Sequence, residues 1–389
     1  MSLHATQPAA AGIYLHIPFC RQACVYCNFH FSTSLRYKDH VLRAMALEIE
    51  LQRNYLGDTP VQTVYFGGGT PSMLSADEIN RLFDVIQRTF RVDDLKEVTL
   101  EANPDDLNIG YIRSLRSTPV NRFSIGIQSF RQPDLDYMKR AHNAQQAEAA
   151  IKGAQDVGFD KLSIDLIYGV PGMTDNHWKE NLDKVRQLQI PHFSAYALTV
   201  EERTALHHAI ANNKAVPVDA AQAAGQFGIL MDTARTMGYE HYEISNLALP
   251  GQYAIHNTNY WRGLPYLGIG PSAHSFDGRH RRAWNVSNNI AYTEALLEDK
   301  KPAREEEVLS PFDHLNEYIM TSLRTQWGCD LDHIARNWDD TTAGTAEESS
   351  HLFQEKYWMV QNGRVLTLTD QGKYFADRIA GDMFVTKED

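Results

Sequence analysis

Between residues 12 and about 200, short hydrophobic runs alternate with longer segments in which apolar residues recur every three to four positions. The short runs are almost continuously hydrophobic, as expected for parallel strands that are covered on both faces. The predicted strands are residues 12–17, 61–66, 97–102, 121–127, 161–169 and 192–198. The predicted helices between them include residues 37–53, 75–90 and 143–159, and Ser75 with Glu78 gives the second of these a capping box.

This alternation predicts an α/β protein whose parallel sheet is built from successive strand–helix units with right-handed crossovers. Six such units indicate a barrel or an open part of one. In this architecture functional groups gather at the carboxyl ends of the strands. The unusual residues of the chain follow that rule: a cysteine cluster, the GGGTPS segment, Glu101 with Asn103, Gln128 and Asp165 each follow or end a predicted strand.

The pattern changes beyond residue 200. Residues 219–237 predict another helix, and residues 240–276 are aromatic, glycine-rich and poorly periodic. The charged, proline-bearing segment 298–311 predicts a linker. We therefore predict a core at 1–297 that includes an extension of the barrel, and a small, mainly helical, winged-helix-like domain at 312–389. Within that domain we expect a strand at 363–369, a following helix and a mobile polar loop at 339–350.

The composition places the chain among ordinary globular proteins. Of its 389 residues 43% are hydrophobic and 22% are charged. The net charge of −12 argues against a general nucleic-acid binder, which needs a basic surface. We find no apolar run near the roughly 20 residues that span a bilayer, and residues 1–10 lack the plan of a signal peptide. We therefore expect a cytoplasmic protein without a transmembrane segment.

Three of the four cysteines, Cys20, Cys24 and Cys27, lie within one short segment, which is unlike a disulfide framework. Their spacing allows a zinc site with His30 as the fourth ligand. It also allows a [4Fe-4S] cluster, in which three thiolates leave one iron open to a reactant. Zinc modules usually place their ligands as two separated pairs, which favours the cluster. The isolated Cys329 predicts a buried, unreactive thiol.

The cysteine motif, with Tyr26 before its last cysteine and GGGTPS after the next strand, resembles the radical S-adenosylmethionine (SAM) superfamily. Seven segments together resemble the oxygen-independent coproporphyrinogen III oxidase-like family, and most nearly its haem chaperone, HemW-like branch: YLHIPFC, YFGGGTPS, EANPDDL, GIQSF, DLIYGVPG, YEISN and HNTNYW. The resemblance implies a partial (β/α)6, TIM-like barrel and a [4Fe-4S] cluster on Cys20, Cys24 and Cys27. It further implies that the amino and carboxylate groups of SAM bind the open iron, and that an electron from the cluster cleaves SAM to a 5′-deoxyadenosyl radical.

By the same resemblance, a further set of residues contacts SAM, the last three of them at positions associated with a second SAM: Tyr14, Tyr26, Gly68, Gly69, Thr70, Glu101, Gln128, Arg140, Asp165, Ala197 and His274. His256 begins the HNTNYW segment, and the resemblance implies that it ligates haem. Imidazole is a common axial haem ligand. A single histidine is nevertheless more often a hydrogen-bonded structural residue, so both interpretations of His256 stay open.

Two departures separate the chain from the oxidases of this family. Phe29 stands where they carry a further cysteine, and only a dozen residues precede the first predicted strand, where they have a long extension. Both favour a haem chaperone that receives electrons from a reductant protein and passes haem to acceptor haemoproteins, such as membrane-associated respiratory enzymes. The alternatives are decarboxylation of coproporphyrinogen III to protoporphyrinogen IX and a zinc-stabilised scaffold without enzymatic activity. No residue is assigned a catalytic role, and enzymatic activity stays an open question.

Overall fold

A computed structural model describes residues 10–385 of the chain. The predicted absence of a signal peptide rests on residues that lie, except for residue 10, outside this range. The first part of the chain alternates strands with helices, as the sequence predicts. Its strands are β1 (Ala11–Ile17), β2 (Val61–Gly68), β3 (Glu97–Ala102), β4 (Arg122–Gln128), β5 (Lys161–Tyr168) and β6 (His192–Ala197). Its helices are α1 (Lys38–Leu51), α2 (Ala76–Thr89), α3 (Ile109–Ser114), α4 (Gln132–Met138), α5 (Ala144–Asp156), α6 (Asp175–Gln187), α7 (Ala205–Ala211) and α8 (Ala220–Thr236), with short 3-10 turns η1 (Pro71–Met73) and η2 (Leu115–Ser117).

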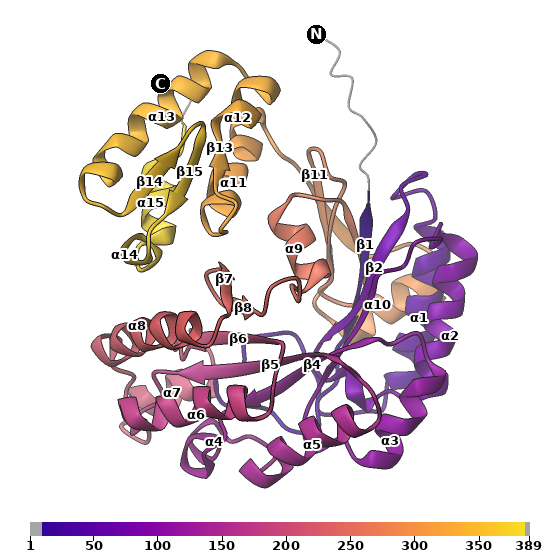
Figure 1. Cartoon of the computed structure of the whole chain (residues 1–389). Coiled ribbons are helices and arrows are strands. Elements are labelled where there is room, and N and C mark those ends of the chain that lie inside the picture. Colours follow the sequence, from indigo (N-terminus) through magenta and orange to yellow (C-terminus); the bar gives the residue numbers. More distant parts are fainter. Residues whose placement is uncertain (1–9, 386–389) are drawn as a thin grey trace.

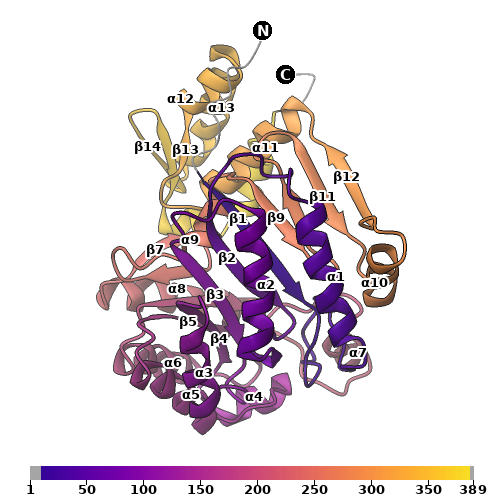
Figure 2. The same ribbon diagram turned by 90° about the vertical axis from the view of Figure 1, so that its right-hand side faces the viewer.

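All six predicted strands are confirmed, and they pair in parallel in the order of the sequence from β1 to β6. The four predicted helices, now α1, α2, α5 and α8, are confirmed as well. Ser75 caps α2 as expected: its side chain accepts a hydrogen bond from the Glu78 amide, and the Ser75 amide donates one to the Glu78 carboxylate. The helices cover the outer face of the curved sheet (Figure 1; Figure 2).

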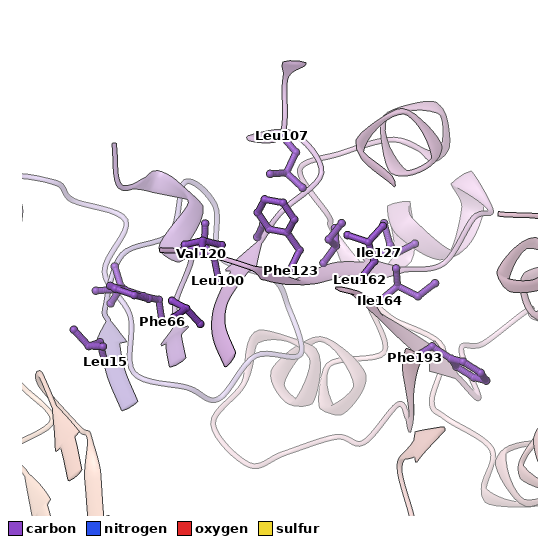
Figure 3. Close-up of a cluster of buried hydrophobic side chains, with 14 of the residues drawn as sticks. Leu15, Phe66, Leu100, Leu107, Val120, Phe123, Ile127, Leu162, Ile164 and Phe193 are labelled. Carbon is purple, nitrogen blue, oxygen red and sulfur yellow. The ribbon is translucent and has the colours of Figure 1, made fainter. Parts of the chain in front are cut away.

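The hydrophobic core lies between this sheet and its helices. Figure 3 shows side chains from successive strands, including Leu15, Phe66, Leu100, Phe123 and Ile164, in one continuous layer. These five side chains have no exposed surface. Each Å² of apolar surface removed from water stabilises the folded state by about 25 cal/mol. The layer is therefore the main stabilising contribution to the core.

The chain then extends both edges of the sheet. The added elements are β7 (Glu240–Glu243), β8 (Asn246–Ala248), α9 (Ile255–Trp261), β9 (Tyr266–Ile269), β10 (His274–Phe276), β11 (Arg281–Asn285), α10 (Asn289–Leu297) and β12 (Arg304–Val308). The complete order is β12-β11-β10-β9-β1-β2-β3-β4-β5-β6-β8-β7. The sheet is open, as expected of a partial barrel. β12 lies within the predicted linker 298–311 and pairs with β11, so part of that segment belongs to the sheet.

The last part of the chain has its own hydrophobic cluster, to which Leu315, Ile319, Leu366 and Ile379 belong. Its elements are α11 (Pro311–Leu323), β13 (Cys329–Asp330), α12 (Leu331–Asn337), α13 (Asp340–Glu355), β14 (Met359–Asn362), β15 (Val365–Leu368), α14 (Asp370–Lys373) and α15 (Ala376–Asp382). Three strands, in the order β13-β15-β14, accompany the helices. This combination of helices and a small three-stranded sheet agrees with a winged-helix-like unit. The exact domain boundaries stay a prediction.

The prediction of a mobile loop at 339–350 is wrong, because these residues form most of α13. Asp339 caps the helix through the Thr342 amide, and Ala343, Ala346 and Phe353 are buried on one face. The prediction for Cys329 is confirmed: its side chain is fully buried, and burial raises its pKa to about 12.

Backbone hydrogen bonds join this last part to the edge of the sheet. The Gln326 amide donates to the Tyr242 carbonyl at 2.9 Å, and the Ile244 amide donates to the Arg324 carbonyl at 3.1 Å. The C-terminal part thereby lies across the inner side of the open barrel (Figure 1). No helix between residues 10 and 385 combines the length and the apolar character that crossing a lipid bilayer requires.

Candidate functional site

The three clustered cysteines lie on the loop that follows β1, at the carboxyl end of the parallel strands. Two backbone hydrogen bonds close the base of this loop: the Cys20 amide donates to the Ser32 carbonyl at 3.0 Å, and the Ser32 amide donates to the Pro18 carbonyl at 2.9 Å. Its sides are fixed by neighbouring loops of the barrel: Arg21 Nε donates to Asp106 at 2.5 Å, and the Gln22 amide group donates to the Lys139 carbonyl at 2.7 Å. The cysteines therefore occupy a defined place on the rim.

The thiol groups of this loop are half-buried and have polar neighbours. Thr70 Oγ1 donates to Cys20 Sγ at 3.3 Å, and Arg140 Nη1 donates to Cys24 Sγ at the same distance. Burial raises the pKa of Cys20 to about 11 and also raises that of Cys27. Since a thiolate is the form that binds metal, deprotonation here requires the positive charge of a bound metal centre.

Arg140 connects the cysteine loop to the third and fourth strands. Its Nη2 donates to Asn103 Oδ1 at 2.7 Å and to the Gly126 carbonyl at 2.8 Å, while Nη1 also lies 3.3 Å from the Tyr26 hydroxyl. Its Nε is buried and has no hydrogen-bond partner among the described residues. The rigid fork of a guanidinium can donate in several directions at once, so this N–H is available to an anionic ligand.

The glycine run that ends β2 and continues to Gly69 packs against the start of the cysteine loop. A Cβ atom at Gly69 would lie 2.7 Å from the Phe19 carbonyl oxygen and 2.8 Å from that of Ile17. Backbone atoms cannot yield as a flexible side chain does, so this position requires glycine. The close approach brings Thr70 within reach of Cys20.

Two carboxylates face the space below the cysteines. Glu101 accepts a hydrogen bond from the Tyr65 hydroxyl at 2.8 Å and one from the Gly68 amide at 3.1 Å, and burial raises its pKa to about 7. Asp165 accepts from Ser194 Oγ at 2.5 Å, and burial raises its pKa as well. Both carboxyl groups can bind a cationic or hydroxyl-bearing ligand, and Glu101 can also exchange a proton near neutral pH.

These residues line a cavity of about 1040 Å³, here called the cysteine cavity. It brings together twelve of the fifteen residues predicted from the sequence: Cys20, Cys24, Tyr26, Cys27, Gly68, Gly69, Thr70, Glu101, Gln128, Arg140, Asp165 and Ala197. Gln128 adopts a left-handed backbone conformation, with φ of 65°, which is uncommon for a residue other than glycine and is typical of functional sites. Half-buried thiols, a spare arginine donor and buried carboxyl groups fit an iron–sulfur cluster with a polar organic ligand beside it.

The zinc alternative finds no support in the geometry. The fourth ligand it requires, His30, hydrogen-bonds through Nε2 to Asn289 at 2.8 Å, and its ring lies 6.2 Å from that of His16. His30 borders a different cavity from the cysteines. Within residues 10–385 no three histidine, cysteine or acidic side chains converge as single-ion ligands.

That different cavity, of about 1160 Å³, lies between the sheet and the C-terminal part. We call it the aromatic cavity, after the side chains that line it: Tyr14, Phe29, Tyr65, Tyr196, Tyr260, Trp261, Tyr266, Phe276, Tyr318 and Trp338. Phe29, Tyr65 and Tyr196 also line the cysteine cavity, so the two spaces adjoin.

The remaining three predicted residues lie on the aromatic cavity. Tyr14 stacks on Tyr65 with ring centroids 5.9 Å apart, and His274 is exposed and stacks on Trp284 at 6.0 Å. Neither lines the cysteine cavity, so the structure does not bring these two predicted SAM contacts together with the other predicted residues. Their role in SAM binding stays a prediction.

His256 has only 1% of its surface exposed, and both ring nitrogens are engaged. Nδ1 lies 2.8 Å from Thr63 Oγ1, and Nε2 lies 2.7 Å from the Tyr260 hydroxyl. Burial lowers its pKa to about 3, which keeps the ring neutral. Ligation of haem by His256, which stays a prediction, requires one of these hydrogen bonds to break.

Some residues of the two cavities were not singled out as site residues from the sequence. Asn103 connects Arg140 to Thr70, since its Nδ2 donates to Thr70 Oγ1 at 3.2 Å. The signal in the sequence is the position of Asn103 directly after the third predicted strand. Arg282 and His314 carry no local signal, because they meet only when the C-terminal part packs on the sheet.

Known proteins resemble this chain in both sequence and fold. Residues 14–185 match the family model of the radical SAM superfamily. The haem chaperone HemW of Bacillus subtilis is 30% identical over 95% of this chain and 97% of its own length, and that of Mycobacterium tuberculosis (strain H37Rv) is 32% identical over 95% and 93%. Among solved structures, coproporphyrinogen III oxidase (HemN) from Escherichia coli aligns with a TM-score of 0.83 over 98% of this chain and 91% of that one. At 21% sequence identity this last likeness shows the fold alone.

Proposed function

Since this chain belongs to the HemW haem chaperone family of the radical SAM superfamily, we propose that it binds haem and delivers it to acceptor haemoproteins. The observation that carries the proposal is the adjacency of the two cavities. One offers three thiols and polar groups for a cluster and SAM, and the other offers aromatic walls and imidazoles for a tetrapyrrole.

In the cysteine cavity we assign the cluster to Cys20, Cys24 and Cys27. When bound, the cluster supplies the electron that cleaves the sulfonium of SAM. Thr70 and Arg140 donate to two of the sulfurs and so stabilise their negative charge. The spare Nε of Arg140 suits the SAM carboxylate, and Glu101 suits the amino group or ribose.

The aromatic cavity is assigned to haem. Large aromatic side chains bury the faces of a planar ligand well, and the few polar groups among them fix its orientation. Phe29 and Tyr196, which are 68% and 45% exposed, stand between the two cavities. A ligand in either space therefore contacts side chains that border the other.

The proposal is tested by titrating the anaerobically reconstituted protein with haem and then adding an apo-haemoprotein. We expect binding of about one haem per chain, followed by its appearance in the acceptor. Failure of the reconstituted protein to bind haem would overturn the proposal. A parallel incubation with coproporphyrinogen III, SAM and a reductant examines the oxidase alternative, and we expect no protoporphyrinogen IX.

A further inference from the structure

We propose that haem in the aromatic cavity is ligated by His314 of the C-terminal part and that its carboxylates are bound by Arg282 of β11. The inference rests on the proposed function, since it takes haem as the ligand. It specifies which wall of the cavity holds the iron.

One face of α11 forms that wall. His314, Glu317, Tyr318 and Thr321 on α11, and Arg324 directly after it, each lie three or four positions from another of the five, and all five line the cavity. Side chains at this spacing lie on the same side of a helix. The face is polar and aromatic, while Leu315 and Ile319 on the opposite side are buried in the C-terminal cluster. α11 therefore presents functional groups to the cavity and apolar groups to its own domain.

His314 is the imidazole placed between the two walls. Its ring lies 6.5 Å from that of Phe276 on the sheet side and 5.5 Å from that of Trp338 on the C-terminal side. Within residues 10–385 neither of its ring nitrogens makes a hydrogen bond. Iron needs a nitrogen lone pair that is not already used as an acceptor.

The other histidines of the cavity are either hydrogen-bonded through a ring nitrogen or stacked on another aromatic ring. Both ring nitrogens of His256 and of His16 are engaged, and so is Nε2 of His30. His333 lies flat on Tyr318, with ring centroids 4.3 Å apart, which restricts its approach to a ligand. His274 is exposed and stacked on Trp284.

Arg282 supplies the complementary charge. Its Nη1 lies 2.6 Å from Glu317 and its guanidinium carbon 5.7 Å from the Phe276 ring centroid. Its Nε is buried without a hydrogen-bond partner among the described residues. A haem carboxylate at this position would satisfy that donor, because guanidinium groups bind carboxylates through paired N–H bonds.

The cavity has the size that this ligand needs. Its volume of about 1160 Å³ exceeds the roughly 300–1,000 Å³ of pockets for ordinary small molecules. Tyr260, Tyr266, Phe276 and Trp338 supply flat apolar surface on both walls. Haem held in this way contacts the sheet and the C-terminal part together.

The experiment compares full-length wild type with His314→Ala, His314→Gln, His333→Ala, His256→Ala and Arg282→Ala, each with its cluster reconstituted anaerobically. Each protein is titrated with haem, and the axial ligand is identified by electron paramagnetic resonance and resonance Raman spectroscopy. His351→Ala, an exposed histidine on α13 away from both cavities, is the matched control.

We expect both His314 variants to lose the histidine-ligated spectrum and to bind haem at least tenfold more weakly, and free imidazole to restore the spectrum. Arg282→Ala should weaken binding without changing the ligand. Wild-type spectra from both His314 variants would overturn the inference, and so would loss of ligation in His256→Ala or His333→Ala with His314→Ala unaffected. If the wild type itself binds no haem, the proposed function is overturned, and this inference with it. Circular dichroism and iron content show whether each variant is folded.

Discussion

The guanidinium of Arg140 lies 3.3 Å from the sulfur of Cys24, although the two residues are 116 positions apart in the sequence. The contact exists because the loop after β1 meets the loop between α4 and α5 at one rim of the sheet. It makes Arg140 both a structural support of the cysteine loop and a source of positive charge at the cluster site.

Replacing Arg140 by methionine should therefore destabilise even the cluster-free protein. Asn103 Oδ1 and the Gly126 carbonyl would lose their buried donor, at about 1–3 kcal/mol for each group left unsatisfied. Urea denaturation of the metal-free chain measures this loss. Arg186→Met is the control, because Arg186 pairs with Asp183 on the exposed surface and should change stability by less than about 0.5 kcal/mol. Equal effects of the two substitutions would contradict the role assigned to Arg140.

Alanine at Cys20, Cys24 or Cys27 should abolish a stable cluster. We expect wild type to take up about four irons per chain with matching sulfide, and each of the three variants to retain only a small fraction. Iron and acid-labile sulfide analysis after anaerobic reconstitution measures both. Cys329→Ala should keep the full iron–sulfur cluster, since Cys329 is buried among the separate hydrophobic side chains of the C-terminal part. Loss of iron from Cys329→Ala alone would contradict this assignment.

A methyl group at Gly69 should displace the cysteine loop. The added carbon would meet the carbonyl oxygens of Phe19 and Ile17 at under 3 Å. We expect Gly69→Ala to lower cluster occupancy severalfold at unchanged overall helix content. Gly225→Ala on α8 is the matched control, because no atom lies within 4 Å of its added carbon and alanine favours a helix. Iron content together with circular dichroism distinguishes local displacement from unfolding.

SAM affinity should depend on pH through Glu101. Burial raises the pKa of this carboxyl group to about 7, so its anionic fraction rises from about a tenth at pH 6 to about nine tenths at pH 8. Because the anion attracts the amino group or the ribose hydroxyls of SAM, we expect wild-type affinity to increase over this interval. Glu101→Gln should bind more weakly and show a flatter profile. Calorimetric titrations of the reconstituted proteins measure the difference, and parallel profiles would exclude Glu101 as the titrating group.

Stability should respond to pH through Glu48, which lies outside both cavities. Its carboxylate accepts hydrogen bonds from Tyr292, Gly270 and Asn285, yet burial raises its pKa to about 7. The folded state then binds more protons than the unfolded state between about pH 4.5 and 7, so this group's contribution falls as the pH rises, by roughly 1 kcal/mol per unit. The stability of wild type minus that of Glu48→Gln should decrease accordingly. Urea denaturation at several pH values tests this, and a constant difference would contradict it.

The sequence predicted the core well because its signals are local. Continuous hydrophobic runs identify the buried strands, and the strand ends identify most of the cysteine cavity. The segment 339–350 misled because its polar composition outweighed a spacing that was present: Ala343, Ala346, Ser350 and Phe353 recur at helical intervals and are buried. Residues such as Arg282 and His314 could not be found in this way. They lie 32 positions apart, and only the packing of α11 against the sheet places them on one cavity.

An open sheet has two strands with unpaired backbone groups, and in other proteins such strands template aggregation. Here the two are protected differently. β12 carries Glu305, Glu306 and Glu307 in succession on an exposed strand, so a second copy approaching it meets like charge. β7 is covered instead by residues 324–326 through main-chain hydrogen bonds. The C-terminal part, besides lining a cavity, thus also shields this edge of the sheet from self-association.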